Sequence, residues 1–526
     1  MGMRCRRSPL GSEGVSLGER SQTPEEHSLT THTASTPVPA RDDVLGRRES
    51  RVIWLLLGAA FVAILNETTM AVAIPHLIDD LGITALMAQW LTTAFMLTMA
   101  VVIPITGFLL QMFSTRRVFL AAMSLFSAGT LMALVAPGFG LLVVARVVQA
   151  SGTAIMMPLL MTTLMTVVPP HMRGRMMGRV SIVMSLAPAI GPTLSGIILD
   201  TLNWRWIFGI VLPIALVMLA VGARWMENIG ETRPAPIDVL SVILSALGFG
   251  GIVFGLSQIG GAAQSGVGAA DSSAVSAWTL SISFAVGGIA LALFIWRQLR
   301  LQRIDDALLD LRVFRARNFT LSIGQMLLMA VAFFGTITIL PLFLQDVLGL
   351  SPTESGLMVL PGAVLMGLLG PVIGRIYDRW GTRVLLVPGA LITAGVLWFY
   401  TTIGELTSPW LLLVVQTVLS VGLAMSFTPL FTASLGSLPR PLYSHGSAVL
   451  GTVQQVAGAA GIAVMFTVMS AIMAGAVDAG MADLPAEASG FRGAFLIAAI
   501  IATPTIVGAF LIRKPADDAG EQAISH

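Results

Sequence analysis

The sequence contains few of the side chains that soluble enzymes use most. Only 11% of its 526 residues are charged, and it has one cysteine, Cys5, and one lysine, Lys514. A lone cysteine excludes a disulfide framework and a cysteine-rich metal site. Because proline follows the lysine, no GxxxxGK[ST] phosphate loop can form, so ATP hydrolysis by this chain is not expected. The histidines are scattered without metal-ligand spacing, so we expect no cofactor, no metal and no enzyme: His27, His32, His76, His171, His445 and His526.

The chain is instead rich in apolar residues. It is 55% hydrophobic, with a mean hydropathy of +0.85, which predicts a protein that lies in a lipid bilayer. Residues 1–50 differ from the rest, because they contain no Phe, Trp or Tyr. We expect them to form a disordered tail. No apolar run follows the arginines near the start, so this tail is not predicted to be a secretory signal.

From residue 52 onward the sequence consists of apolar runs long enough to cross roughly 30 Å of hydrocarbon, for which about 20 helical residues suffice. This pattern predicts an all-α integral membrane protein with fourteen transmembrane helices. An even number of crossings returns both termini to one side. The predicted helices begin near Val52, Gln89, Arg117, Phe139, Met176, Trp206, Ile237, Ala277, Phe319, Glu354, Val384, Trp410, Gly446 and Gly493.

The arginines indicate which side is cytoplasmic. They gather in alternate connections, while the other connections carry mostly acids, such as Asp79, Asp80 and Asp346. Cytoplasmic loops of membrane proteins carry an excess of Arg and Lys. We therefore expect a multi-pass protein of the inner (cytoplasmic) membrane with both termini in the cytoplasm. The arginine-rich connections lie at Arg41–Arg51, Arg116–Arg117, Arg173–Arg179, Arg224–Arg233, Arg297–Arg317, Arg375–Arg383, Arg440 and Arg513.

One ten-residue string occurs twice. GRIYDRWGTR at 374–383 repeats GFLLQMFSTR at 107–116, with a constant offset of 267 (374 − 107). The first copy ends predicted helix 2 and the second ends helix 10, which indicates two six-helix halves separated by two inserted helices. Parallel halves of this kind place a transport site at their interface. The expected division is a tail (1–50), an N-terminal bundle (51–225), the inserted pair (226–300), a C-terminal bundle (301–513) and a second tail (514–526).

Predicted helix 5 adds a second motif, Pro188-Ala189-Ile190-Gly191-Pro192 followed by Gly196. With these strings, the chain after residue 50 resembles the fourteen-helix drug:proton antiporters of the major facilitator superfamily, particularly the lincomycin-resistance-like branch. The resemblance implies the major facilitator fold, with helices 1, 4, 9 and 12 around a cavity. It also assigns the proline–glycine string to the antiporter motif of exporters. An ordinary kinked helix is the alternative, and an importer of the same fold would lack this motif.

The repeated string corresponds to the loop motif of the superfamily. The second copy keeps Gly374, Asp378, Arg379, Gly381 and Arg383, and the first keeps Gly107 and Arg116 but has Gln111, Met112 and Ser114 in place of the acid, the arginine and the second glycine. Glycine permits close helix packing, and a carboxylate near a helix terminus binds arginines and backbone donors. We therefore expect a latch on the cytoplasmic side that is strong in the second copy and weak in the first.

Glu67 is the one acid deep inside a predicted span. A charge there costs roughly 2.5 to 3.5 kcal/mol, so it usually faces a cavity or a partner. Arg146 lies at a similar depth, seven residues after Phe139, which permits a pair with Glu67. Two alternatives are that Glu67 lies among the headgroups and that Arg146 extends to the surface. The usual helix 1 acid of the family falls at Asn66, so in this chain the acid is shifted or replaced.

The second half lacks both charges. Phe334 aligns with Glu67 at the offset of 267, and Gln416 aligns with Arg146 at the offset of 270 that pairs Gly152 with Gly422 and Pro169 with Pro439. We therefore assign proton coupling to Glu67, Asn66 and Arg146 in the first half. The candidate residues of the substrate cavity are Gln149, Gln325, Gln416 and Met157; the resemblance places Arg146 and Gln149 in the helix 4 motif of the family.

The resemblance implies a proton-coupled efflux antiporter that exports lipophilic or cationic drug-like compounds by alternating access. The alternative is a proton-coupled transporter of a specific metabolite, peptide or lipid. The expected partners are a small-molecule substrate, protons and the bilayer, with no nucleic acid, and the expected state is a monomer.

Overall fold

The structure of the protein is a computed structural model that describes residues 46–228, 238–264, 273–304 and 306–515. In these ranges the chain forms α-helices joined by short turns and no β-strand, which confirms the all-α prediction. The first helix begins at Arg47, so the last residues of the expected tail belong to a helix. Residues 1–45 and 516–526 of the two predicted tails lie outside the described residues.

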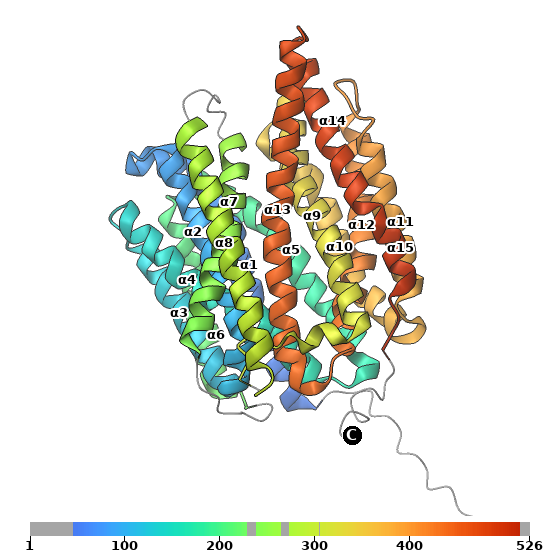
Figure 1. Ribbon diagram of the computed structural model, residues 1–526. Helices are drawn as coiled ribbons and strands as arrows, with labels where there is room; N and C mark the ends of the chain where they lie inside the picture. Colours follow the sequence, from blue (N-terminus) through green and yellow to red (C-terminus); the bar gives the residue numbers. More distant parts are fainter. Residues whose placement is uncertain (1–45, 229–237, 265–272, 305, 516–526) are drawn as a thin grey trace, which may run out of the picture. The chain divides into compact units, whose positions relative to one another are not determined.

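Fourteen apolar spans are present in the described ranges, as the sequence predicts. Figure 1 shows them as a set of long, roughly parallel helices, with α14 and α15 forming one span that is interrupted at Thr503. The helices are α1 (Arg47–Leu81), α2 (Ala85–Met112), α3 (Thr115–Leu134), α4 (Phe139–Val167), α5 (Arg173–Thr201), α6 (Arg205–Trp225), α7 (Val239–Gln264), α8 (Ser273–Leu301), α9 (Arg317–Leu342), α10 (Pro352–Trp380), α11 (Arg383–Tyr400), α12 (Pro409–Gly436), α13 (Tyr443–Asp478), α14 (Asp483–Ala502) and α15 (Pro504–Leu511).

Local signals in the sequence set several helix ends. Ser351 and Glu354 form a capping box at the start of α10, in which the Ser351 hydroxyl accepts from the Glu354 amide at 3.3 Å. Gly381 ends the same helix with a φ of +83°, a conformation that other residues rarely adopt. We call the end of the molecule at which α1 starts and α10 ends the arginine-rich end.

Glycines bring helices within each half into close contact. Gly152 of α4 packs against the backbone of α3 at Ala122, and Gly461 of α13 packs against Val331 of α9. Lipid tails are as apolar as leucine, so helix association in a bilayer depends on such close packing rather than on the hydrophobic effect. A side chain at either glycine would collide with backbone atoms.

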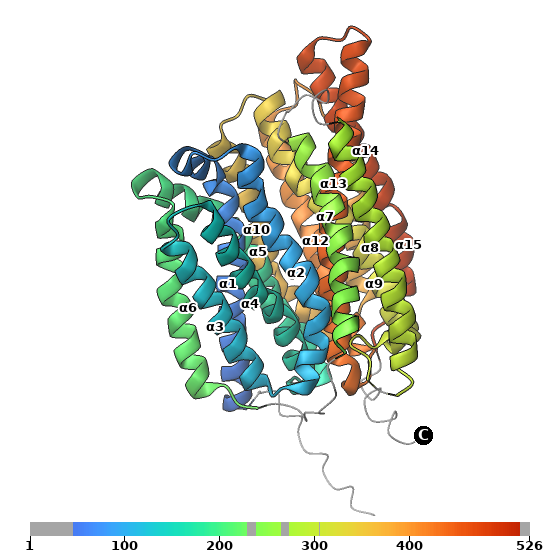
Figure 2. The same ribbon diagram turned by 60° about the vertical axis from the view of Figure 1, so that its left-hand side comes forward.

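The inserted pair covers one seam between the halves. Figure 2 shows α7 beside both α2 and α13. Its Phe254 ring lies 5.7 Å from the Trp90 ring of α2, and Val253 forms a small core with Ala100 of α2 and Ala459 of α13. The insertion therefore contacts both six-helix bundles.

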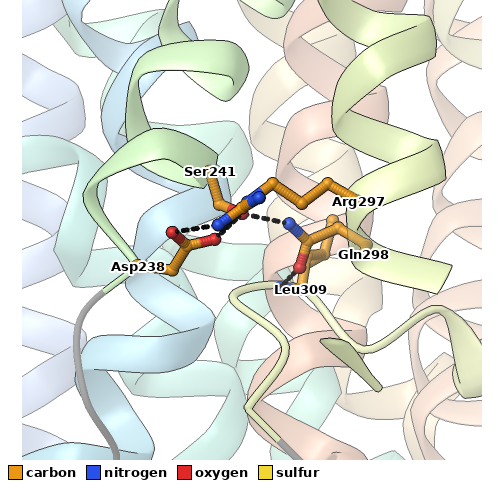
Figure 3. Close-up of polar contacts among 5 residues, drawn as sticks. All are labelled: Asp238, Ser241, Arg297, Gln298 and Leu309. Atoms are coloured by element: carbon orange, nitrogen blue, oxygen red, sulfur yellow. Dashed lines mark hydrogen bonds and ion pairs between the residues drawn. The ribbon is translucent and has the colours of Figure 1, made fainter. Parts of the chain in front are cut away.

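A polar network fastens the arginine-rich end of this pair (Figure 3). Arg297 of α8 binds both carboxylate oxygens of Asp238, at 2.6 and 2.9 Å, and the Ser241 hydroxyl donates to the same carboxylate at 2.5 Å. The Gln298 amide donates to Ser241 at 2.7 Å and accepts from the Leu309 amide at 3.1 Å. The network thus joins both inserted helices to the segment that leads into α9.

Asp238 immediately precedes α7, and the hydrogen bond and charge of Arg297 lower the pKa of its carboxyl group below the usual range. We expect Asp238→Asn to lower the free energy of unfolding by about 1–2 kcal/mol, because one of two charged partners is lost. Thermal unfolding of the purified protein would measure this loss of stability, and Asp79→Asn, on the exposed end of α1, is the control. A carboxylate with a lowered pKa stabilises the folded state above its unfolded pKa, so the difference should shrink as the pH falls below about 4. A difference that stays constant with pH would contradict this assignment.

Candidate functional site

Helix α5 positions the part of α1 that carries Glu67. Gly191 of the predicted antiporter motif lies directly against the Thr68 side chain, and the Ser195 hydroxyl donates to the Thr69 carbonyl at 2.9 Å. Only Gly allows this approach at position 191, whereas a Cβ atom at Gly196 would meet no atom within 4 Å. Gly191 of this motif therefore allows α5 to pack closely against α1, one residue from Glu67.

Pro188 and Pro192 lie inside α5, which runs without interruption from Arg173 to Thr201. Neither proline ends the helix. Each removes one backbone donor, and this frees carbonyl groups in the turn before it.

Glu67 and Asn66 differ in their surroundings. The Glu67 side chain is partly buried and lies three residues before Met70, where the apolar span of α1 ends. The Asn66 side chain is 1% exposed, and neither its nitrogen nor its oxygen has a hydrogen-bond partner among the described residues. A buried amide without partners costs free energy, so its presence beside the acid needs an explanation.

Arg146 is buried at 1% exposure, so it does not extend to the surface. Its guanidinium group donates to the Gln149 oxygen at 2.7 Å and lies 4.1 Å from the centre of the Phe95 ring. Gln149 in turn donates to the Thr130 hydroxyl of α3 at 2.8 Å. The arginine is thus held by its own half of the molecule.

The charges of Glu67 and Arg146 interact electrostatically. Among the described residues, however, no ion pair within 4.0 Å joins them. The predicted pair is therefore a pair of neighbouring charges rather than a salt bridge, and the Arg146 hydrogen bond goes to Gln149 instead.

The glutamines expected in a cavity bond within their own halves. The Gln325 amide of α9 donates to the Thr505 carbonyl of α15 at 2.8 Å, and Gln416 of α12 accepts from the Tyr400 hydroxyl at 2.9 Å. Both are buried, as is Gln149. In this conformation the three amides take part in contacts between helices, and Gln416 also lines a small pocket with Leu412 and Met358. Their role in a substrate cavity stays a prediction. Met157 is partly buried against the main core.

The second copy of the repeated string joins the two halves. Asp378, near the end of α10, accepts from the backbone amides of Gly174 and Arg175, at 2.7 and 2.8 Å. These amides open α5 and have no partner within the helix, and the helix dipole favours a negative charge there. Gly374 and Gly174 bring the two backbones into contact, so a Cβ at either would collide with the other helix.

The other motif residues of this copy have different surroundings. Arg379 lies with its guanidinium 5.8 Å from the Trp380 ring centre, Gly381 ends α10, and Arg383 begins α11 on the exposed surface. None of these three hydrogen-bonds to the Asp378 carboxylate in the described structure, so the latch contact consists of the acid and the glycine.

The first copy makes the corresponding contact in a weaker form. Gln111 donates one hydrogen bond, at 2.9 Å, to the Pro441 carbonyl before α13, and Gly107 packs against His445 of α13. Arg116 instead bonds the Ala223 carbonyl of α6, in its own half. A neutral amide thus stands where the second copy has a carboxylate.

Two hydroxyl pairs also connect the halves. Ser181 of α5 lies 2.6 Å from Thr428 of α12, and Thr162 of α4 lies 2.7 Å from Ser447 of α13. All side-chain hydrogen bonds that we find between α1–α6 and α9–α15 in the described ranges lie toward the arginine-rich end. The structure is therefore a conformation held closed at that end.

Comparisons with known proteins agree with this arrangement. The family model of the Major Facilitator Superfamily matches residues 56–462. The chain is 42% identical over 475 residues to an uncharacterized MFS-type transporter, YcnB, of Bacillus subtilis, covering 90% of this chain and 97% of the relative. It is 41% identical over 468 residues to the lincomycin resistance protein LmrB of Listeria monocytogenes, covering 88% and 96%.

Among solved structures, the human organic anion transporter MFSD10 matches with a TM-score of 0.57 at 15% identity, covering 86% of this chain and 99% of that one. The proton:xylose symporter XylE matches with a TM-score of 0.55 at 14% identity, covering 86% and 94%. These two show a shared fold. Fold and sequence together define a membrane transporter. The chain belongs to the major facilitator superfamily, and its sequence is similar to lincomycin-resistance proteins.

The Asp378 contact can be tested directly. Asp378→Asn should weaken closure of the arginine-rich end by about 1–3 kcal/mol, because a neutral side chain accepts from the helix amides less strongly than a carboxylate. Distances between spin labels at Arg224 and Arg383, which are exposed on opposite halves, should shift to longer values. Glu405→Gln, in an exposed turn at the other end, is the matched control. An unchanged distance distribution would show that the carboxylate does not hold the halves together.

Proposed function

We propose that the protein exports lipophilic or cationic drug-like compounds in exchange for protons, by alternating access. The observation that carries the proposal is Glu67, a partly buried acid inside a membrane span, near the buried Arg146 but not bonded to it. The names of the relatives support the substrate class, since they include lincomycin resistance proteins and the multidrug transporter MdtP of Bacillus subtilis, at 27% identity.

The arginine distribution supports a cytoplasmic position for the arginine-rich end. Connections at that end hold Arg116, Arg175 and Arg383, while the opposite end holds acids such as Asp79 and Asp80. The positive-inside rule then places both termini in the cytoplasm. In this orientation the described conformation is closed to the cytoplasm.

The contacts of Arg146 support the proposal that Glu67 binds a proton and a cationic substrate in turn. Gln149 and the Phe95 ring fix the guanidinium group, so its charge stays in place whether Glu67 is ionised or neutral. A Glu67 carboxylate without a direct salt bridge is available to a proton or to a cationic substrate. Binding of one then excludes the other, which is the requirement for exchange.

Proton movement supplies the driving force in this scheme. A proton that enters from outside neutralises Glu67 and releases a cationic substrate, and loss of the proton to the cytoplasm restores the charged site. For a neutral substrate, one proton charge moving inward through 100 mV provides about 2.3 kcal/mol, which supports roughly 50-fold accumulation per proton. The exchange of one proton for one monovalent cation moves no net charge, so in that case the pH gradient alone drives export.

Asn66 fits a role beside Glu67. Its amide is buried without a partner in the described structure, and leaving such a group unpaired costs about 1–3 kcal/mol. A bound substrate or water would satisfy it. We therefore include Asn66 in the proton and substrate site, beside the acid.

Glu67→Gln should abolish proton-driven export, because the amide cannot exchange a proton. Ethidium retention in an efflux-deficient host, with and without an uncoupler, measures this. We expect the uncoupler-sensitive part of efflux to fall at least about tenfold, with Asp79→Asn as the control for loss of an acid on the same helix. Normal pumping by Glu67→Gln would exclude Glu67 as the proton carrier.

A second variant tests the position of the acid. Asn66→Asp combined with Glu67→Gln moves the carboxylate by one residue and should restore part of the uncoupler-sensitive efflux. Export of ethidium that an uncoupler does not affect, in the unmodified protein, would contradict proton coupling itself.

A further inference from the structure

The internal repeat pairs Arg173 with Tyr443. At the offset of 270 that aligns Pro169 with Pro439, each is the first residue of its helix, α5 or α13, and each follows a short 3₁₀ turn. Parallel halves of this kind are related by an approximate two-fold axis along the membrane normal, and two residues related by it can touch only if both lie near that axis. Contact between them therefore locates the centre of the interface between the halves.

The structure places these two side chains in contact. The Arg173 guanidinium group donates to the Tyr443 hydroxyl at 3.2 Å, and its central carbon lies 5.5 Å from the centre of the Tyr443 ring. Arg173 is 9% exposed and Tyr443 is 3% exposed. An arginine at the end of a membrane helix usually extends into water, so its burial here needs a structural cause.

That cause is the end of α4. Arg173 donates to the carbonyls of Val168 and Met165, at 3.2 and 3.0 Å. The last carbonyls of a helix lack partners within the helix and carry its negative partial charge. Arg173 is thus fixed to the N-terminal half by its own hydrogen bonds, whereas Tyr443 reaches it from the C-terminal half.

Other contacts between the halves surround this pair. On one side Asp378 binds the start of α5, and on the other Gln111 binds the Pro441 carbonyl within η4 (Arg440–Leu442). One or two turns deeper in the membrane lie the hydroxyl pairs Ser181–Thr428 and Thr162–Ser447. The Arg173–Tyr443 pair therefore occupies the middle of the closed region.

We propose that Arg173 and Tyr443 form an axial gate that closes the cytoplasmic end of the transport path. The inference rests on the proposed function, because it uses alternating access and the cytoplasmic orientation. On opening, Arg173 stays on the α4 carbonyls and Tyr443 leaves with α13. Only one hydrogen bond and one ring contact break at the axis, so the gate can open in every transport cycle.

Cysteine labelling tests the gate without reference to any substrate. Cys5 is the only cysteine of the chain, so Cys5→Ser provides a clean background. Ser447→Cys, one helical turn beyond Tyr443 on α13, is the reporter. Its reaction with a membrane-impermeant thiol reagent is followed in inside-out vesicles, which expose the cytoplasmic side.

Tyr443→Ala should raise the labelling rate about tenfold, since a hydrogen bond and a cation–π contact are lost together. Tyr443→Phe should raise it less, because the ring remains. Tyr400→Phe is the matched control: it removes a buried hydroxyl that bonds Gln416 within one half, and it should leave the labelling rate unchanged.

The outcomes separate the gate from the proposed function. A labelling rate that rises with Asp378→Asn but not with either Tyr443 variant would overturn the axial gate. It would show that the contact between α5 and α10 closes this end instead. A rise with Tyr443→Ala in right-side-out vesicles instead would support the gate but reverse the proposed orientation. A higher labelling rate with Tyr443→Ala in inside-out vesicles, together with ethidium efflux that an uncoupler does not change, would support the gate and contradict proton coupling.

Discussion

The carboxylate of Asp378 on the first amides of α5 is the interaction on which the described conformation depends most. It joins an acid near the end of α10, in the C-terminal half, to the N–H groups that have no partner within the helix at the start of α5, in the N-terminal half. The contact is possible only because Gly374 and Gly174 allow the two backbones to touch. A charged hydrogen bond is stronger than a neutral one yet breaks without any covalent change, which suits a contact that forms and separates in each cycle.

The two seams between the halves are closed by different means. At α5–α10, glycine contacts and the carboxylate act together, whereas at α2–α13 a single amide, Gln111, bonds a carbonyl. The second seam is the one that α7 covers (Figure 2). Phe254 of α7 packs against Trp90 of α2, and Val253 of α7 contacts both α2 and α13. The inserted pair thus adds apolar contact to the seam whose latch motif carries no acid, in the middle of α2 and toward the end opposite Gln111. The network around Asp238 connects the same pair to the start of the C-terminal bundle (Figure 3).

The charges inside the membrane are also divided unequally. The N-terminal half carries Glu67 and Arg146, and their counterparts in the other half, Phe334 and Gln416, carry none. The buried Gln416 bonds Tyr400 within its own bundle. Since each buried charge in a bilayer is costly, a half without such charges can specialise in packing and gating. In the proposed mechanism one half responds to protons, while the other supplies the Asp378 carboxylate that contacts α5 and Tyr443 of the proposed gate.

The number of spans, the repeat and its offset could all be predicted from the sequence, because hydrophobic length and motif spacing are local properties of the chain. The sequence also shows that only the second copy of the repeated string offers an acid, and the structure shows the Asp378 carboxylate in contact with the amides of Gly174 and Arg175. Other features depend on distances between helices that are far apart in sequence. Only the tertiary structure decided that Arg146 bonds Gln149 rather than Glu67, and that Gln325 faces α15. A hydrogen bond forms with whichever partner packing brings within about 3 Å, and hydropathy contains no information about that choice.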